Sequence, residues 1–395
     1  MIHISREKDC CGCGACRAVC PTDAIAMQHA TLGALIPTVD TDRCVQCGAC
    51  DRVCPMSNRV DGSDALRSDA YAAYAKDDSV RYSGSSGGMF GTFATHLIQE
   101  GYLVYGAAFD EHLQLKCTGA ETVEQLAPLT KSKYLQSDAS AQYAEIKRAL
   151  DSGRSVLFVS TPCQVTALKC YLGKEYDTLI TVDFFCHGVP SQHFFDQCVG
   201  WFEEQRGVRV TDFSFRSKMR RGATPHYYTI TYRDGTATKQ ETKLYFDFPF
   251  YAAFQRYVTL RESCYDCRFA TPRRHADITI GDFHEIDRYV KGINRFDGVS
   301  TVIVHTEKGR RLWSACEEGL TVHAMDIRRM TEDGVCFSGG TVRPTSRDAF
   351  AADYAQLPFD AFLKKHLDVA RYRKQRLYYA LPRWLRTILK KLMRI

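Results

Sequence analysis

Two copies of one cysteine pattern constrain the amino-terminal sixty residues. The pattern is C-x2-C-x2-C-x3-C-P, and its copies end at Cys20-Pro21 and at Cys54-Pro55. This spacing suits a cubane iron–sulfur cluster, because three thiolates on one tight loop cap three irons while the fourth cysteine points elsewhere. In two-cluster modules the fourth cysteine serves the other cluster. The repeat therefore predicts one [4Fe-4S] cluster on Cys10, Cys13, Cys16 and Cys54, and a second on Cys44, Cys47, Cys50 and Cys20.

A zinc module is the alternative for these cysteines, since zinc also accepts four thiolates. Zinc sites usually consist of two C-x-x-C pairs, however, and need neither a third cysteine nor Cys-Pro. The small residues of the loops, Gly12, Gly14, Ala15, Gly48 and Ala49, would let backbone amides approach the cluster sulfides. Cys11 falls outside the pattern and is expected to be a spare thiol. Residues 1–60 resemble the bacterial two-cluster ferredoxin domain.

The number of cysteines and the amino-terminal sequence indicate the cellular compartment. The chain has 18 cysteines, and its amino terminus, MIHISREKDC, lacks the apolar segment of a secretory signal. We therefore expect metal-bound thiolates in a reducing cytoplasm rather than a disulfide framework. No run approaches the roughly 18 to 20 apolar residues of a membrane span, so an integral membrane protein is not expected.

After a polar linker, apolar runs and amphipathic segments alternate. The expected strands cover 70–75, 102–109, 155–160 and 178–185, and the expected helices cover 85–101, 138–153 and a segment from Pro162. This alternation indicates an α/β core with a largely parallel sheet. After about Val208, short strands with tight turns such as YRDGT suggest an α+β portion.

The predicted fold class is accordingly α/β to α+β, with a small ferredoxin-like cluster domain before a larger mixed flavin and iron–sulfur domain. We expect a cluster domain at 1–60, a linker at 61–70, an α/β part at 71–206, an α+β part with a third cluster at 207–345, and a basic helical tail at 346–395.

The loop SGSSGGMF, Ser83 to Phe90, precedes an apolar helix. Its unpaired amides and the helix dipole could receive a phosphate. A plain N-cap with a tight turn explains the same residues, and the loop is neither a P-loop nor a G-x-G-x-x-G fingerprint.

A third group of cysteines follows in the large domain. Cys163 and Cys186 each follow an apolar strand, and ligands of open α/β sheets bind beyond the carboxyl ends of the strands. Cys264 and Cys267 form a C-x-x-C ahead of another strand. Four thiolates suit a third cluster or a zinc ion, and spacing alone leaves both open. Cys117, Cys170, Cys198, Cys316 and Cys336 lack ligand spacing and are expected to be packing residues.

Six ordered motifs in residues 68–340 resemble the coenzyme F-420 hydrogenase/dehydrogenase beta-subunit family. They are SSGGMF, KSKYLQSD, TPCQVTAL, CHGVPS, CYDCRFA and DITIGDF. The resemblance implies FAD and an iron–sulfur cluster in this region. By position, it implies a third [4Fe-4S] cluster on Cys163, Cys186, Cys264 and Cys267. It also implies flavin contacts from Ser86, Gly87, Gly88, Lys131, Lys133, Tyr134 and Gln136, although a solvated basic turn would equally explain KSKY.

The resemblance implies an oxidoreductase that passes single electrons from the ferredoxin-type clusters through the third cluster to FAD. FAD would then reduce a two-electron acceptor, such as a deazaflavin like coenzyme F-420 or a substrate in polysaccharide metabolism. A flavin is the cofactor that exchanges both one and two electrons. The alternatives are an electron-transfer subunit without a substrate site, and a zinc-bearing regulatory protein. No pair of C-x-x-C motifs suggests a nickel–iron centre, so hydrogen chemistry would need another subunit.

The carboxy-terminal tail bears on partners. Residues 364–395 contain eleven Lys or Arg and one acid, and LPRWLRTILKKLMRI interleaves apolar and basic residues at helical spacing. Such a helix can lie on an anionic membrane surface or pack against the body or a partner, and both remain open. We expect a redox partner such as a ferredoxin or a hydrogenase-like subunit, a cytoplasmic location with the tail as a candidate contact to the inner face of the membrane, and no nucleic acid.

Overall fold

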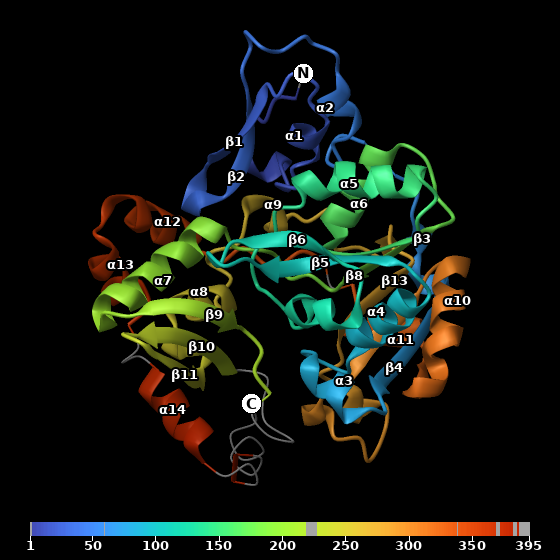
Figure 1. The fold of residues 1–395 in the computed structure, drawn as a ribbon. Helices are drawn as coiled ribbons and strands as arrows, with labels where there is room; N and C mark the ends of the chain where they lie inside the picture. Colours follow the sequence, from blue (N-terminus) through green and yellow to red (C-terminus); the bar gives the residue numbers. More distant parts are fainter. Residues whose placement is uncertain are drawn as a thin grey trace.

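The structure is a computed structural model that describes residues 2–58, 60–218, 227–337, 339–368, 372–381 and 385–386. Residues 2–58, here called the N-terminal module, lie at the top of the view in Figure 1. The remaining described residues, here called the body, lie below and contain the large sheet. The small cluster domain and the larger mixed domain of the predicted fold class are therefore both present.

The N-terminal module contains one hairpin and two short helices. Strands β1 (Ile25–His29) and β2 (Leu35–Val39) pair antiparallel, and helices α1 (Ala15–Val19) and α2 (Ala49–Arg52) carry Cys16 and Cys50. Each helix begins after a glycine in the left-handed conformation, Gly14 with φ 78° and Gly48 with φ 69°. Only glycine adopts this conformation without strain, so both copies of the repeat turn into their helices in the same way.

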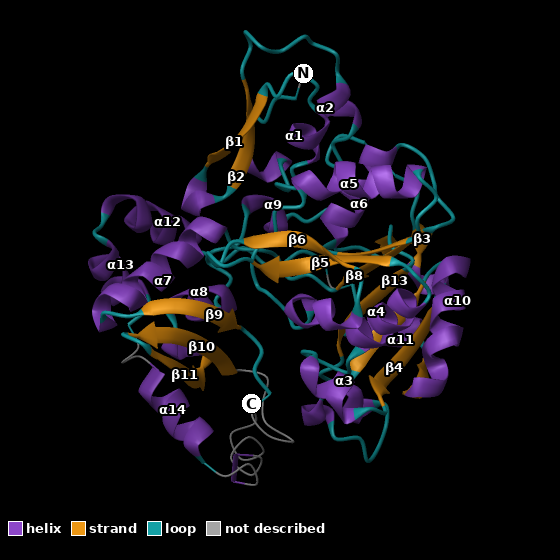
Figure 2. Ribbon diagram, viewed as in Figure 1, coloured by secondary structure: helices purple, strands orange, loops and turns teal. Residues whose placement is uncertain are grey.

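Among the described residues, the largest sheet has eight strands in the order β15-β4-β14-β13-β8-β7-β5-β6. The central strands β5 (Leu103–Phe109), β7 (Val156–Val159), β8 (Leu179–Phe184) and β13 (Ile278–Asp282) are parallel. The flanking strands, drawn in orange in Figure 2, pair antiparallel with their neighbours: β4 (Asp69–Ala75), β6 (Leu115–Ala120), β14 (Ser300–Val304) and β15 (Leu320–Met325). The expected strands are present, but the prediction of a largely parallel sheet holds only for the centre.

Helices cover both faces of this sheet. In β7, Leu157 faces the core that contains α4 (Met89–Gln99) and α10 (Glu307–Cys316). Its neighbours Val156 and Phe158 face the core that contains α5 (Ser140–Asp151) and α6 (Pro162–Leu172). Successive side chains of a strand point to opposite faces, so one short apolar strand serves both cores. Helices α5 and α6 lie between the sheet and the N-terminal module (Figure 1).

A second, three-stranded sheet within the described residues follows the α/β part, as expected after Val208. It consists of β9 (Arg209–Ser214), β10 (Tyr227–Asp234) and β11 (Ala237–Leu244) in antiparallel order. Phenylalanine and tyrosine side chains dominate its core, and Phe194, Phe195, Phe213, Phe215, Phe248 and Phe250 are all buried there. The helices that pack around it are α7 (Gln192–Arg206), α8 (Pro249–Gln255), α12 (Arg347–Gln356) and α13 (Phe359–His366).

The segment predicted as a linker, residues 61–70, is structured. Strand β3 (Ser63–Asp64) pairs with β12 (Arg273–Arg274), Ala65 is fully buried, and β4 already begins at Asp69. The remaining helices are α3 (Asp78–Ser83), α9 (Glu262–Tyr265), α11 (Ile327–Glu332) and α14 (Arg373–Ala380).

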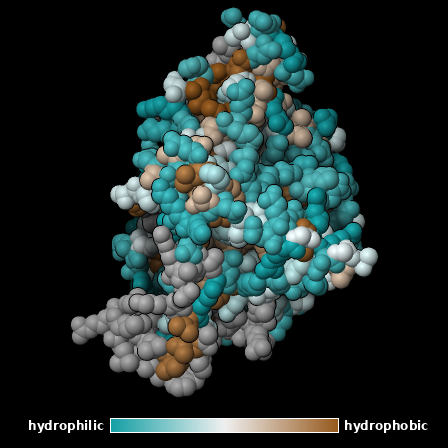
Figure 3. Space-filling view, turned by 90° about the vertical axis from the view of Figure 1, so that its left-hand side faces the viewer, coloured by the Kyte–Doolittle hydropathy of each residue, from teal (hydrophilic) through white to brown (hydrophobic). Residues whose placement is uncertain are grey.

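The predicted amphipathic helix at 381–395 lies outside the described residues except for Leu381, Leu385 and Arg386. None of the helices in the described ranges is long and apolar enough to cross a membrane. The face seen in Figure 3 is mainly hydrophilic, with apolar residues gathered near the top, at the height of the N-terminal module.

A buried ion pair stabilises the centre of the sheet. Arg274 donates to Asp183 at 2.6 Å, and their side chains are 2% and 1% exposed. Removing one partner leaves the other charge buried and unpaired, so Asp183→Ala should lower the free energy of unfolding by about 3–5 kcal/mol.

Urea unfolding followed by fluorescence measures this loss. The matched control is Asp69→Ala, which breaks the half-exposed pair of Asp69 with Arg310 and should cost only about 0.2–1 kcal/mol. Equal losses in the two variants would contradict the structural role of the buried pair.

Candidate functional site

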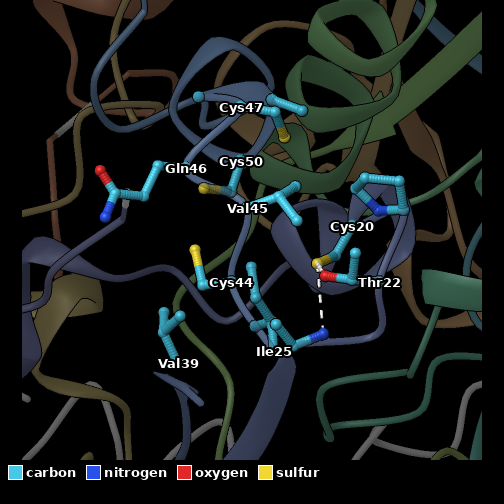
Figure 4. Close-up of a pocket in the computed structure, with 13 residues that line it drawn as sticks. Cys20, Thr22, Ile25, Val39, Cys44, Val45, Gln46, Cys47 and Cys50 are labelled. Atoms are coloured by element: carbon cyan, nitrogen blue, oxygen red, sulfur yellow. Dashed lines mark hydrogen bonds between the residues drawn. The ribbon is translucent and has the colours of Figure 1, made fainter. Parts of the chain in front are cut away.

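The predicted second cysteine set lines one cavity. Cys20, Cys44, Cys47 and Cys50 surround a partly open space of about 340 Å³, together with apolar residues such as Ile25 and Val39 (Figure 4). Cys47 is exposed, Cys44 and Cys20 are half-buried, and Val45 beside them is 62% exposed. This set therefore lies near the surface of the molecule.

The predicted first set lines a separate cavity of about 320 Å³. Cys10, Cys13, Cys16 and Cys54 are all buried there. The structure thus places Cys54 beside the first loop and Cys20 beside the second, as the predicted exchange of fourth ligands requires. The first set is the more deeply buried of the two.

The residues of both cavities fit iron–sulfur clusters. The amides of Gly12, Ala24 and Ile2 donate to the sulfurs of Cys10, Cys20 and Cys50, each at 3.3 Å. Amide donors of this kind stabilise negative charge on cluster sulfurs and tune the reduction potential. In the described part of the chain, no three His, Cys, Asp or Glu side chains converge as ligands of a single metal ion.

The third set gathers at the carboxyl edge of the parallel strands. Cys163 follows β7 in the first turn of α6, and Cys186 follows the neighbouring strand β8. Burial raises the pKa of Cys186, and the charges of Cys264, Cys163 and Cys267 raise it further because these thiols lie close by. All four predicted ligands of the third site are therefore neighbours.

Cys11, the spare thiol of the first loop, lies between two of these sets. Its side chain lies close to Cys13 of the first set and to Cys163 of the third, since both thiols act on its pKa and all three pack in one core cluster. Its carbonyl oxygen accepts a hydrogen bond from the Gln136 side chain at 2.7 Å. The first and third sets therefore meet at Cys11, which its place outside the spacing pattern did not suggest.

The loop Ser83 to Phe90, here called the flavin loop, lies beside the same sheet edge. Its polar groups, however, form hydrogen bonds with other residues of the protein. The Gly87 amide donates to the Ser300 hydroxyl at 2.9 Å, and the Ser86 hydroxyl donates to the carbonyl of Val299. A Cβ on Gly87 would lie 2.4 Å from the carbonyl oxygen of Ala73. Gly88, with φ 89°, begins α4. Close packing against the sheet thus explains why residue 87 is a glycine, and no bound phosphate is needed to explain it.

The other four predicted flavin residues separate into two places. Tyr134 and Lys133 lie near the flavin loop, and exposed Lys131 adjoins them; the Ser132 amide donates to Ser85 at 2.7 Å. Gln136 instead faces the N-terminal module through its bond to Cys11. Gln136 therefore belongs with the cysteine sets in the structure.

Two cations that sequence reasoning missed lie at the flavin loop. Arg216 donates to Tyr134 at 2.9 Å, to Asp282 at 2.7 Å and to the carbonyl of Ser85 at 3.2 Å. The Lys218 amine donates to the carbonyls of Arg81 and Ser86. Both residues follow β9, and no spacing or motif marks them in the sequence.

The electrostatics of this region favour an anion. Burial, followed by the charges of Arg81 and Arg216, lowers the pKa of Lys218 to about 8. Burial and the nearby Lys131 lower the pKa of Lys133 to about 7. At Asp282, burial works to raise the pKa, but the Arg216 guanidinium outweighs it and the pKa is lowered. The two lysines therefore lose solvation, and the single carboxylate of Asp282 does not balance the positive charge of the region.

His187 links this cationic region to the third cysteine set. It follows Cys186 directly, and burial lowers its pKa, as does the charge of His284, while Asp282 acts in the opposite direction. Since these charges act on one another, the third set and the Arg216–Asp282 pair lie at the same edge of the sheet.

Comparisons with known proteins match two segments of the chain to protein families. Residues 9–58 match the 4Fe-4S dicluster domain. Residues 153–329 match the family described as the C terminus of the coenzyme F420 hydrogenase/dehydrogenase beta subunit. No curated protein matches the chain.

One solved structure that matches is that of the F420-reducing [NiFe] hydrogenase complex from Methanosarcina barkeri, determined with xenon derivatization. The match has 18% sequence identity and a TM-score of 0.42, and it covers 70% of this chain and 95% of the matched chain.

The N-terminal module therefore makes the chain an iron–sulfur protein with a redox role. Residues 153–329 therefore resemble the coenzyme F420 hydrogenase/dehydrogenase beta-subunit family, and the resemblance indicated by the sequence motifs is confirmed.

The exchange of fourth ligands generates a prediction. Cys54→Ser should change the same electron paramagnetic resonance signal of the reduced protein as Cys10→Ser, because both thiols line the first cavity. Cys20→Ser should instead change the signal that Cys44→Ser changes.

Cys11→Ser is the control and should keep both signals, since a hydroxyl can replace the hydrogen bonds of a thiol that is not a ligand. Loss of half of the iron–sulfur absorbance in Cys11→Ser, or a shared signal change in Cys54→Ser and Cys44→Ser, would contradict the assignment.

Proposed function

We propose that the chain is an iron–sulfur flavoprotein oxidoreductase. Its two ferredoxin-type clusters supply single electrons through a third [4Fe-4S] cluster to FAD, and a two-electron acceptor completes the reaction. The acceptor is a deazaflavin like coenzyme F-420 or another oxidised substrate, including one from polysaccharide metabolism.

The contact of Cys11 with Cys163 is the observation that carries this proposal. It places the first set beside the third, with Cys11 buried and Cys163 half-buried. Beyond the third set, His187 lies within electrostatic range of Asp282, the partner of Arg216. The cysteine sets and the cationic region thus follow one another from the N-terminal module into the body.

Solvent exposure also decreases along this series, from the second set to the first. The second set is near the surface, with exposed Cys47 and Val45, and the first set is buried against the body. A redox partner, such as a ferredoxin or a hydrogenase-like subunit, would exchange electrons at the second set. Burial of the inner sets excludes water and the side reactions that water permits.

Charge supports a flavin at the sheet edge more than loop geometry does. Lys218 and Lys133 are partly desolvated cations held by backbone carbonyls, and Arg216 is buried beside them. Their positive charge would attract the pyrophosphate of FAD, whereas the neutral Gly87 amide already donates to Ser300. When bound, FAD supplies the exchange between one-electron and two-electron chemistry.

An electron-transfer subunit without a substrate site is the second candidate. The exposed side chains of Cys47 and Val45 favour it, because they leave the second set open to contact with a partner protein. In this second function the sets at the sheet edge would deliver electrons to another subunit. The basic tail would then contact that subunit or the inner face of the membrane.

Analysis of iron, sulfide and flavin after anaerobic purification tests the proposal. We expect about twelve iron atoms and one flavin per chain, from three cubanes and one FAD. Lys218→Gln should lower the flavin content and leave iron unchanged, because it removes a half-buried charge at the flavin loop. Lys116→Gln removes an exposed lysine from β6 and should change neither.

The contradictory results separate the alternatives. Twelve iron atoms without flavin would favour the electron-transfer subunit, and eight iron atoms without flavin would refute the third cluster as well. A colourless protein with zinc would refute the redox function of all three sets.

A further inference from the structure

Arg261 lies between the first and third cysteine sets. It precedes α9, which carries Cys264, and its side chain reaches into the N-terminal module. There, Nη2 donates to the carbonyl oxygens of Leu35 at 2.8 Å and Cys10 at 3.3 Å, and it lies 3.9 Å from the Cys10 sulfur. One guanidinium thus connects the two parts of the protein at the cysteines.

The charge of Arg261 is buried among neutral groups. The residue is 4% exposed, and Nη1 donates to the amide oxygen of Gln136 at 3.0 Å. Its Nε atom is buried without a hydrogen-bond partner. None of these acceptors carries a carboxylate charge, and burying a cation without an anion is costly.

The first loop is shaped to accept this cation. Gly12 has φ 65°, and a Cβ at that position would lie 2.5 Å from the Arg261 Cζ atom. A side chain on residue 12 would therefore displace the guanidinium from Cys10. Glycine at this position serves both the tight loop and the close approach of the charge.

Among the acceptors of Arg261, the Cys10 sulfur is the one that can carry a negative charge, and it lies 3.9 Å from Nη2. A cluster held by Cys10 would therefore supply the anionic partner of this buried cation.

We propose that Arg261 raises the reduction potential of the first cluster. This inference rests on the proposed function, because it requires a cluster on the first set. Each reduction adds one electron to a cluster and no bond forms or breaks. A nearby fixed positive charge stabilises the added electron, so Arg261 would favour electron transfer from the second cluster to the first.

Redox titration of the anaerobic full-length protein, followed by electron paramagnetic resonance, tests this inference. In Arg261→Gln we expect the first cluster to become at least tenfold harder to reduce, a shift of about 59 mV to more negative potential for a one-electron couple. The potential of the second cluster should stay at the value of the parent protein. Arg261→Lys keeps the charge and should keep most of the potential.

Arg17→Gln is the matched control. Arg17 also connects the N-terminal module to the body, through Ser140 at 2.7 Å and Asp138 at 3.3 Å, but its side chain is 43% exposed. This variant loosens the same junction without removing a buried charge, so both potentials should remain unchanged.

The outcomes are distinct. An unchanged first-cluster potential in an iron-replete Arg261→Gln protein would overturn the inference. If that variant loses iron, Arg261→Lys decides, since a potential close to the parent supports the role of charge and a tenfold loss refutes it. A parent protein without iron would refute the proposed function instead.

Discussion

The arrangement of the candidate site depends on parallel strands that end at one edge of the sheet. Because β7 and β8 are adjacent and parallel, Cys163 and Cys186 emerge side by side, and Asp282 ends the next strand, β13. The apolar sequences of β7 and β8 allow burial on both faces, which fixes this centre of the sheet firmly. The reactive groups therefore lie on short segments after rigid strands rather than on long loops.

The second requirement is the attachment of the N-terminal module. Tyr143 of α5 donates to the carbonyl of Cys13 at 3.0 Å, and Gln136 donates to that of Cys11. These contacts hold the first cysteine loop against α5 and α6, so that Cys11 lies close to Cys163. The module is thus fixed to the body, and the segment between them contributes β3 to the body rather than acting as a free linker.

Local signals explain which features could be predicted from the sequence. The cysteine repeat has a fixed spacing with a chemical cause, and the apolar strands 155–160 and 178–185 are recognisable from their own composition. The antiparallel positions of β14, β4 and β15 depend on pairings between distant segments, which no local pattern encodes.

Arg216 and Lys218 reach the flavin loop from the end of a strand in another sheet, so no sequence neighbour marks them. The family resemblance placed Gln136 with the flavin, yet its side chain donates to the carbonyl of Cys11.

Electron transfer through the third cysteine set is the central claim, and rapid mixing of the anaerobic, FAD-loaded protein with a one-electron reductant tests it most directly. Absorbance would follow bleaching of the clusters and of the flavin separately in the parent protein and in Cys163→Ser. We expect the variant to reduce its N-terminal clusters normally but to bleach its flavin at least tenfold more slowly. Flavin bleaching at the rate of the parent protein in Cys163→Ser would contradict the claim.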